Sequence, residues 1–200
     1  MKIYINKIRY LGILGILRLV RDLLISALFF KFGSLFRYPF YVRSLGTLEI
    51  GTGFRSGPGL VIDILNDNAI IKIGKNFRVN SRLHLGCADN IIIGDNVLIA
   101  SDVYISDHTH GSYNFEFQNS PETLVNNREL VSKKITICNN VWIGEKTCIL
   151  PGVTIGENSI IGALSLVNKN IPPNSMYAGI PAKCIKKFDY YSNSWISQKN

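Results

Sequence analysis

The sequence predicts a mainly β protein whose central part winds as a parallel β-helix. Between residues 137 and 167 an aliphatic side chain recurs at every sixth position, and glycine directly follows three of these aliphatics. A helix requires apolar spacing near 3.6 residues and a half-buried strand requires about 2. A period of six instead fits short strands joined by tight turns and stacked as coils. The recurring aliphatics are Ile137, Ile143, Ile149, Ile155, Ile161 and Val167.

Composition agrees with a single β-rich domain and appended segments. The chain has 200 residues, of which 46% are hydrophobic and 18% charged, with 17 glycines. Low charge and many glycines suit a solenoid better than a helical bundle. The four cysteines, at 87, 138, 148 and 184, form neither a zinc pattern nor a disulfide framework. We therefore expect small structural cysteines in a reducing compartment.

Positive charge gathers at the start of the chain. Residues 1–46 hold eight lysines and arginines against one acidic residue, Asp22, so they carry +7 of the total net charge of +8. A basic end on a nearly neutral body indicates an interaction surface. No RNA-binding signature accompanies it, so we do not expect a nucleic-acid partner.

Within this segment, residues 9–32 predict an apolar helix that ends near Gly33. Three charged residues interrupt it, so the uncharged stretches are shorter than the roughly 20 residues of a membrane span. No signal-peptide cleavage site follows. Aromatic residues crowd positions 29–41 beside basic ones. Two interpretations stay open: a helix at the membrane interface, or a helix that packs on the coil or a neighbouring subunit and covers an open coil end.

The repeat extends more loosely on either side of its regular part. From residue 47 the six-residue spacing appears in two runs, separated by a two-residue slip near positions 87–90. Residues 106–134 break the phase and predict a loop extruded from the coil, a common place for function. Two prolines are expected to end the coil. The predicted segments are an N-terminal segment 1–46, a coil 47–187 that ends its strands at Pro172 and Pro173, and a tail 188–200.

Five motifs occur in order along the C-terminal half: WIG, PGVTIG, IGALSLV, IPPN and AGIPAK. With them, residues 47–187 resemble the hexapeptide-repeat acyltransferases. They are most similar to the sugar O-acetyltransferase branch, which includes galactoside and maltose acetyltransferases and enzymes that modify O-antigen or capsule. The resemblance implies a left-handed β-helix, a homotrimer, acetyl-CoA as donor and no metal. The spacing by itself predicts a coil but not its handedness.

Two histidines of the loop are candidate catalytic bases. Transfer to a hydroxyl requires a base, and the unperturbed pKa of histidine lies near neutrality. The stretch VLIASDVYISDH is similar to the one that ends in the family's catalytic histidine, which implies His108, with His110 as the alternative. Asp107 could orient the ring, but the alternation of side chains along a strand argues against it, because adjacent side chains point apart. His84 is beside the inward Leu85 and should point away from the core.

The remaining site residues are implied by the resemblance alone. Asn80 matches an acceptor-site asparagine. The backbone N–H near Glu145 matches the position beside the thioester, where the galactoside enzymes have serine, and could stabilise an oxyanion. Two lysines replace arginines that meet the CoA phosphates and keep the charge without the bidentate geometry. The predicted donor-binding residues are Trp142, Gly144, Glu145, Ala163, Asn168, Lys183 and Lys186.

These observations predict acetyl-CoA-dependent O-acetylation of a sugar hydroxyl, on a lipid-linked or nucleotide-linked precursor of surface polysaccharide. The enzyme would be a cytoplasmic homotrimer, with a peripheral contact to the inner membrane face left open. The alternatives are an N-acetyltransferase acting on an amino-sugar nucleotide or an antibiotic, and a binding module without catalysis. A γ-class carbonic anhydrase, with zinc on three histidines, is disfavoured because the spacing of His108 and His110 does not match that family.

Overall fold

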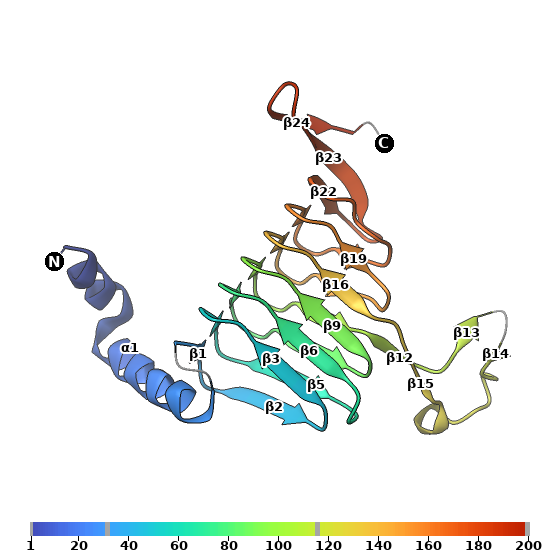
Figure 1. Cartoon of the computed structure of the whole chain (residues 1–200), viewed down its shortest axis with the longest axis horizontal. Coiled ribbons are helices and arrows are strands. Elements are labelled where there is room, and N and C mark those ends of the chain that lie inside the picture. The colour runs from blue at the N-terminus through green and yellow to red at the C-terminus, as the bar shows by residue number, and fades with distance from the viewer. Residues whose placement is uncertain (1, 31–32, 115–116, 199–200) are drawn as a thin grey trace.

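The computed structural model describes residues 2–30, 33–114 and 117–198, and it confirms the predicted coil of hexapeptide repeats. The chain passes through three sheets in turn and then returns to the first, so the three sheets form the faces of a triangular prism. Figure 1 shows the coils stacked in chain order, with a helix at the N-terminal end and a loop projecting from one side. We name the faces A, B and C in the order in which the chain reaches them.

Face A continues past the coils into an antiparallel extension. Its parallel strands are β1 (Leu35–Phe36), β4 (Arg55–Ser56), β7 (Arg78–Val79), β10 (Leu98–Ile99), β17 (Trp142–Ile143), β20 (Ile160–Ile161) and β22 (Ser175–Ala178). The extension consists of β23 (Lys183–Asp189) and β24 (Ser194–Ser197).

Faces B and C contain only parallel strands. Face B holds β2 (Phe40–Ser44), β5 (Leu60–Ile64), β8 (His84–Cys87), β11 (Tyr104–Ser106), β18 (Cys148–Ile149) and β21 (Leu166–Val167). Face C holds β3 (Thr47–Ile50), β6 (Ile70–Ile73), β9 (Asn90–Ile93), β16 (Ile135–Ile137) and β19 (Thr154–Ile155). The projecting loop contains β12 (His108–His110), β13 (Tyr113–Asn114), β14 (Phe117–Gln118), the 3₁₀ helix η1 (Val125–Asn127) and β15 (Leu130–Ser132).

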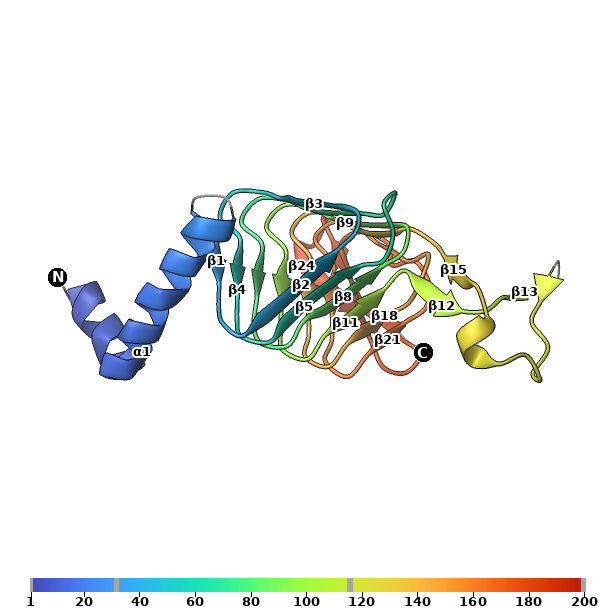
Figure 2. The ribbon, with the colours of Figure 1, turned by 90° about the horizontal axis from the view of Figure 1, so that it is seen from below.

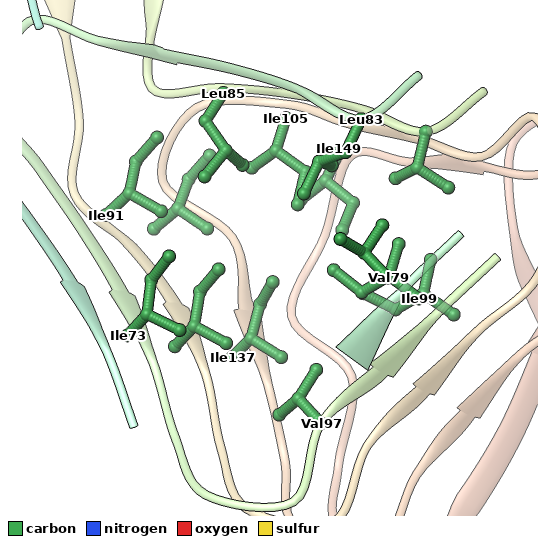
Figure 3. Packing of buried hydrophobic residues seen from close by; sticks show 14 of the residues in the cluster. Ile73, Val79, Leu83, Leu85, Ile91, Val97, Ile99, Ile105, Ile137 and Ile149 are labelled. Atoms are coloured by element: carbon green, nitrogen blue, oxygen red, sulfur yellow. The ribbon is translucent and has the colours of Figure 1, made fainter. Parts of the chain in front are cut away.

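The six-residue spacing has a direct structural meaning. Six residues carry the chain from one face to the next, so three repeats bring it back to the same face one coil further on. Ile143 accordingly pairs with Ile161, and Ile149 with Val167. All of the recurring aliphatics are fully buried, and Figure 3 shows such side chains from all three faces converging on the interior. Each contributes on the order of 1.5–3 kcal/mol through burial.

The first coils are longer than the regular repeat. The partners' numbers show that the first coil takes 20 residues, from Leu35 to its partner Arg55, and that the next takes 23, from Arg55 to its partner Arg78. The extra residues lengthen the strands of faces B and C to four or five residues, as in β5. This explains why the sequence spacing slips before the regular part of the repeat.

Helix α1 (Lys2–Phe29) contacts β1 at the open end of the first coil and extends outward from it. The helix kinks at Gly12, whose φ of 63° is left-handed. At its end, Phe30 stacks on Phe36 with ring centroids 3.8 Å apart, and Phe36 stacks on Phe54 at 4.5 Å. Among the described residues, no helix is long and apolar enough to cross a membrane.

The structure corrects several predicted bounds. The helix ends at Phe29 rather than near Gly33, because Phe30 leaves the helix to stack on the coil. Coil strands begin at Leu35, ahead of residue 47. They also continue past the two prolines, since β22 pairs in parallel with β20, and residues of the predicted tail form β24. Lys31 and Phe32, part of the predicted basic and aromatic cluster, lie outside the described residues.

Candidate active site

The strongest chemical feature of the molecule lies where the chain leaves face B for the projecting loop. His108 begins β12, directly after β11, and its side chain is only 12% exposed. Its Nδ1 lies 3.1 Å from Oδ1 of Asp107. This corrects the expectation that the two side chains point apart. Asp107 belongs to neither strand, so the alternation of side chains along a strand does not apply across it.

Asp107 is fully buried, and its carboxylate is well supplied with donors. The backbone N–H groups of Ala88 and Asp89 donate to it at 2.7 and 2.8 Å. Burial by itself raises the pKa of the Asp107 carboxyl, but the hydrogen bonds from His108 and from this backbone outweigh it. The pKa is therefore lower than usual. An ionised Asp107 is a hydrogen-bond acceptor for the Nδ1–H group of His108 and so favours the tautomer with Nε2 unprotonated, the form a general base requires.

Cys87 completes the surroundings of this carboxylate. Its thiol donates to Oδ2 of Asp107 at 3.4 Å. Burial, with a smaller contribution from the Asp107 charge, raises the pKa of the Cys87 thiol to about 12. Cys87 is therefore a neutral hydrogen-bond donor near neutral pH and not a nucleophile.

The position of the His108 ring depends on a glycine on the neighbouring coil. A Cβ added to Gly86 would lie 3.3 Å from Cε1 of His108, so the absence of a side chain there makes room for the ring. Within the described residues, Nε2 of His108 has no hydrogen-bond partner. His110 is two residues further along β12 and is exposed. Its ring centroid lies 6.5 Å from that of His108. The geometry thus favours His108 over His110 as the base.

The loop is held to the coil beside these histidines. β12 and β15 pair in antiparallel fashion, which joins the two ends of the projecting loop. A groove of about 280 Å³ lies between the base of the loop and the coil, and Asn168 lines it together with Thr109 and Lys133. Figure 2 shows the loop extending away from the prism. The predicted Asn168 therefore lies near the base of the loop that carries His108 and His110.

Most of the other predicted residues follow strands of face A, where the chain turns towards face B. We call this corner the A–B edge. Asn80, Glu145 and Ala163 are all exposed on it, after β7, β17 and β20. Gly144 is buried there, and an added Cβ would lie 2.5 Å from the Ala163 nitrogen, so the close approach of coils requires glycine. The structure thus gathers the predicted acceptor residue and several predicted donor residues along one edge.

His108 lies on a different edge, where the chain turns from face B towards face C. The two edges bound face B on opposite sides, so a single coil does not bring His108 to Asn80 or Glu145. The structure therefore separates the predicted base from the predicted A–B edge residues within one chain.

The last predicted residues lie near the C-terminal extension. Lys183 is exposed and Lys186 partly buried, both on β23. Trp142 is 50% exposed on face A and lines a groove of about 400 Å³ with Phe188 and Trp195 of the extension. Half of the Trp142 side chain is therefore accessible at this groove.

Sequence reasoning missed two residues that shape this site. Strand alternation argues against Asp107, although the SDH sequence places a carboxylate beside the histidine. No sequence pattern marks Gly86 as a site residue, because its role depends on a contact between coils. Within the described ranges, no cluster of three or more His, Cys, Asp or Glu side chains is placed to hold a metal ion. His84 faces outward, as predicted, with Nε2 3.2 Å from Oδ2 of Asp63.

Comparison with known proteins places the chain in a family. The family model for bacterial transferase hexapeptides, with six repeats, matches residues 134–169. The chain is 38% identical over 185 residues to WbbJ of Escherichia coli K12, provisionally assigned as a lipopolysaccharide biosynthesis O-acetyl transferase, covering 92% of this chain and 94% of that protein. It is 45% identical over 119 residues to galactoside O-acetyltransferase of the same organism, covering 60% and 55% of the two chains.

Solved structures of acetyltransferases agree with the family match. A maltose O-acetyltransferase from Clostridium difficile 630 matches with a TM-score of 0.56 and 28% identity over 86% of this chain and 88% of that one. Galactoside acetyltransferase in complex with coenzyme A matches at 0.51 and 32%, over 80% and 64% of the chains. AntD, an N-acyltransferase from Bacillus cereus, matches at 0.66 over 80% and 83%, but at 21% identity it shows only the fold. The chain belongs to the hexapeptide-repeat acetyltransferase family, in the branch that includes the sugar O-acetyltransferases, and it is an acetyltransferase.

Proposed function

We propose that this enzyme transfers an acetyl group from acetyl-CoA to a sugar hydroxyl of a lipopolysaccharide or capsule precursor in the cytoplasm. The observation that carries the chemistry is the Asp107–His108 pair, with the Nδ1 of His108 held by a buried carboxylate and Nε2 left free. The 38% identity to WbbJ over nearly the whole chain supports surface polysaccharide as the acceptor class. The complex of galactoside acetyltransferase with coenzyme A supports the donor.

In the proposed mechanism, Nε2 of His108 takes the proton from the acceptor hydroxyl as its oxygen attacks the thioester carbon. The resulting tetrahedral intermediate carries a negative charge on the former carbonyl oxygen. When it collapses, the carbon–sulfur bond breaks, and the CoA thiolate leaves with the proton that His108 had accepted. Asp107 stabilises the imidazolium that exists between these two proton transfers.

The oxyanion needs a hydrogen-bond donor, and the backbone N–H of Glu145 is available for this role. Within the described residues this N–H donates no hydrogen bond, whereas the neighbouring Gly144 and Lys146 N–H groups bond to Ile161 and Ser101. A fixed backbone donor of this kind lowers the barrier because it does not reorganise during the reaction. The exposed Lys183 and partly buried Lys186 on β23 supply positive charge for the CoA phosphates.

The site that we propose is shared between subunits of a homotrimer. His108 and the A–B edge residues lie on opposite sides of face B, so one chain cannot bring them together. A three-fold arrangement of prisms can place the His108 edge of one subunit against the A–B edge of its neighbour. Asn80 of that neighbour would then contact the acceptor, and Trp142, Glu145 and Ala163 would line the path of the donor.

The decisive experiment measures CoA release with candidate acceptors, for the wild type and for His108→Ala. Loss of the base should lower turnover by about a hundredfold or more, with the affinity for acetyl-CoA largely kept. His110→Ala is the matched control and should retain most activity. Turnover that survives His108→Ala but not His110→Ala would assign the base to His110. An amine acceptor that reacts while sugar hydroxyls do not would establish the N-acetyltransferase alternative.

Subunit sharing has its own test. His108→Ala and Ala163→Trp, which would block the donor path, should each be inactive alone. After the two proteins are unfolded together and refolded as mixed trimers, some interfaces combine an intact His108 with an intact Ala163, so activity should return. A monomer by light scattering that still turns over, or a mixture that stays inactive although mixed trimers form, would refute the shared site.

A further inference from the structure

Helix α1 packs on the coil through its polar side chains. Asp22 is 1% exposed and Ser26 is fully buried. The Ser26 hydroxyl accepts a hydrogen bond from the Phe36 N–H at 2.8 Å and donates to the Asp22 carbonyl at 2.6 Å. Asp22 also pairs with Arg21 at 2.6 Å. The helix therefore turns the side that carries Asp22 and Ser26 towards the first coil.

The opposite side of the helix is apolar and faces outward. After the adjacent pair Ile13 and Leu14, its side chains recur at intervals of three and four residues, which places them on one helical face. Each is between 49% and 78% exposed. This is the reverse of an ordinary surface helix, and a contiguous apolar patch of this kind marks an interaction site. We call this the outward ridge: Ile13 78%, Leu14 70%, Leu17 61%, Val20 49%, Leu24 68% and Leu28 76% exposed.

Two apolar hollows flank the helix and enlarge this surface. One, of about 620 Å³, is lined by the ridge residues Val20 and Leu24 together with Leu35 of the first coil and their neighbours. The second, of about 530 Å³, is lined by Phe29 and Tyr41 and their neighbours. Figure 2 shows α1 extending outward from the end of the prism. The outward ridge and the two hollows therefore lie at the same end of the molecule.

The charges at this end identify the occupant. Asp22, the single acidic residue among the first 46, is buried and paired with Arg21, whereas Arg18, Arg21 and Arg55 are exposed around the helix. A basic rim beside an apolar ridge is complementary to the anionic headgroups and acyl chains of a lipid bilayer. Tyr38 and Tyr41 are 55% and 60% exposed beside the helix, in keeping with the aromatic residues found at membrane interfaces.

We propose that α1 lies in the headgroup region of an anionic membrane, with the outward ridge towards the acyl chains and the coil held above the surface. Docking would use the end of the prism at which the first coil begins. The inference does not depend on which acceptor the enzyme uses, because it rests on the surface of α1 alone. It adds a location to the proposed function, because an enzyme on the membrane surface would reach acceptors anchored in the same membrane without diffusion through the cytoplasm.

The test is flotation of the full-length protein with two kinds of vesicle, pure phosphatidylcholine and an equal mixture of phosphatidylcholine and phosphatidylglycerol. The wild type should bind the mixed vesicles, bind pure phosphatidylcholine less, and be partly released by high salt. Leu17→Glu combined with Leu24→Glu should weaken binding by at least about tenfold, since two ridge leucines lose their burial. Both positions are exposed, so the fold should be retained.

The matched control is Leu124→Glu combined with Tyr191→Glu, which makes the same charge change at exposed apolar residues of the projecting loop and the C-terminal extension. It should bind as the wild type does. Acetylation of a water-soluble acceptor, measured in parallel, should be unchanged in the ridge variant, which separates failure of docking from failure of the proposed activity. Absence of vesicle binding by the wild type would refute the inference. A ridge variant that binds vesicles as the wild type does would also refute it. If that variant in addition changes its oligomeric state by light scattering, the ridge is a contact between subunits.

Discussion

Replacing Asp107 with asparagine tests whether the buried carboxylate supports His108 as the proposed catalytic base. The substitution keeps the shape of the side chain but removes the charge that lies 3.1 Å from Nδ1 of His108. A hydrogen bond to a charged group is worth about 1.5–3 kcal/mol, and each 1.4 kcal/mol changes a rate by about tenfold. If that bond stabilises the imidazolium of the transition state, kcat should fall by roughly 10- to 100-fold.

The assay is CoA release at saturating acetyl-CoA. Asp63→Asn is the matched control, since it removes a carboxylate 3.2 Å from another histidine, His84, on the same face. That pair is partly exposed and outside the proposed chemistry, so its loss should leave kcat within about twofold.

The stability of the variant must be measured alongside. One of the two backbone N–H groups that now donate to Asp107 would face the new amide NH₂, which costs about 1–3 kcal/mol of unfolding free energy. The double variant Asp107→Asn, His108→Ala separates the two effects, because the carboxylate should contribute nothing further to kcat once the ring is gone. A folded Asp107→Asn enzyme with the wild-type kcat would show that this reasoning is wrong.

Three further predictions follow from the same contacts. Gly86→Ala places a methyl group 3.3 Å from Cε1 of His108 and should lower kcat by about tenfold with the circular dichroism spectrum unchanged, since small displacements of a base are costly; a wild-type rate would mean that the ring adapts. Ile143→Ala, in the fully buried core, should reduce the free energy of unfolding in urea by about 2–5 kcal/mol; a loss under half of that would mean that the coil collapses around the gap. Because the pKa of Asp107 is lowered on folding, its stabilisation is complete above the ordinary value of about 3.9 and disappears as the pH falls through the lower folded value. Urea unfolding from about pH 6 to pH 3 should therefore show a smaller loss of stability for Asp107→Asn than for the wild type.

The sequence by itself was enough to predict the coil, because its periodicity is local. One aliphatic every six residues is a property of neighbouring positions, and residues such as Ile143 and Ile161 need no distant partner to reveal the pattern. Motif order likewise pointed to His108, since the SDH stretch directly follows a regular repeat. The net charge of the first 46 residues also required only composition.

Only the tertiary structure decided which contacts surround these residues. Asp107 turns back to His108 because the chain changes direction between two strands, and Gly86 makes room from another coil, so neither role is visible in local spacing. The face of α1 that meets the coil was also undetermined by sequence. Leucines usually pack inward, yet here Ser26 accepts a hydrogen bond from the coil and leaves Leu17 and Leu24 outside. Which face is buried depends on the partner that a helix meets, and that partner is set by the folded chain.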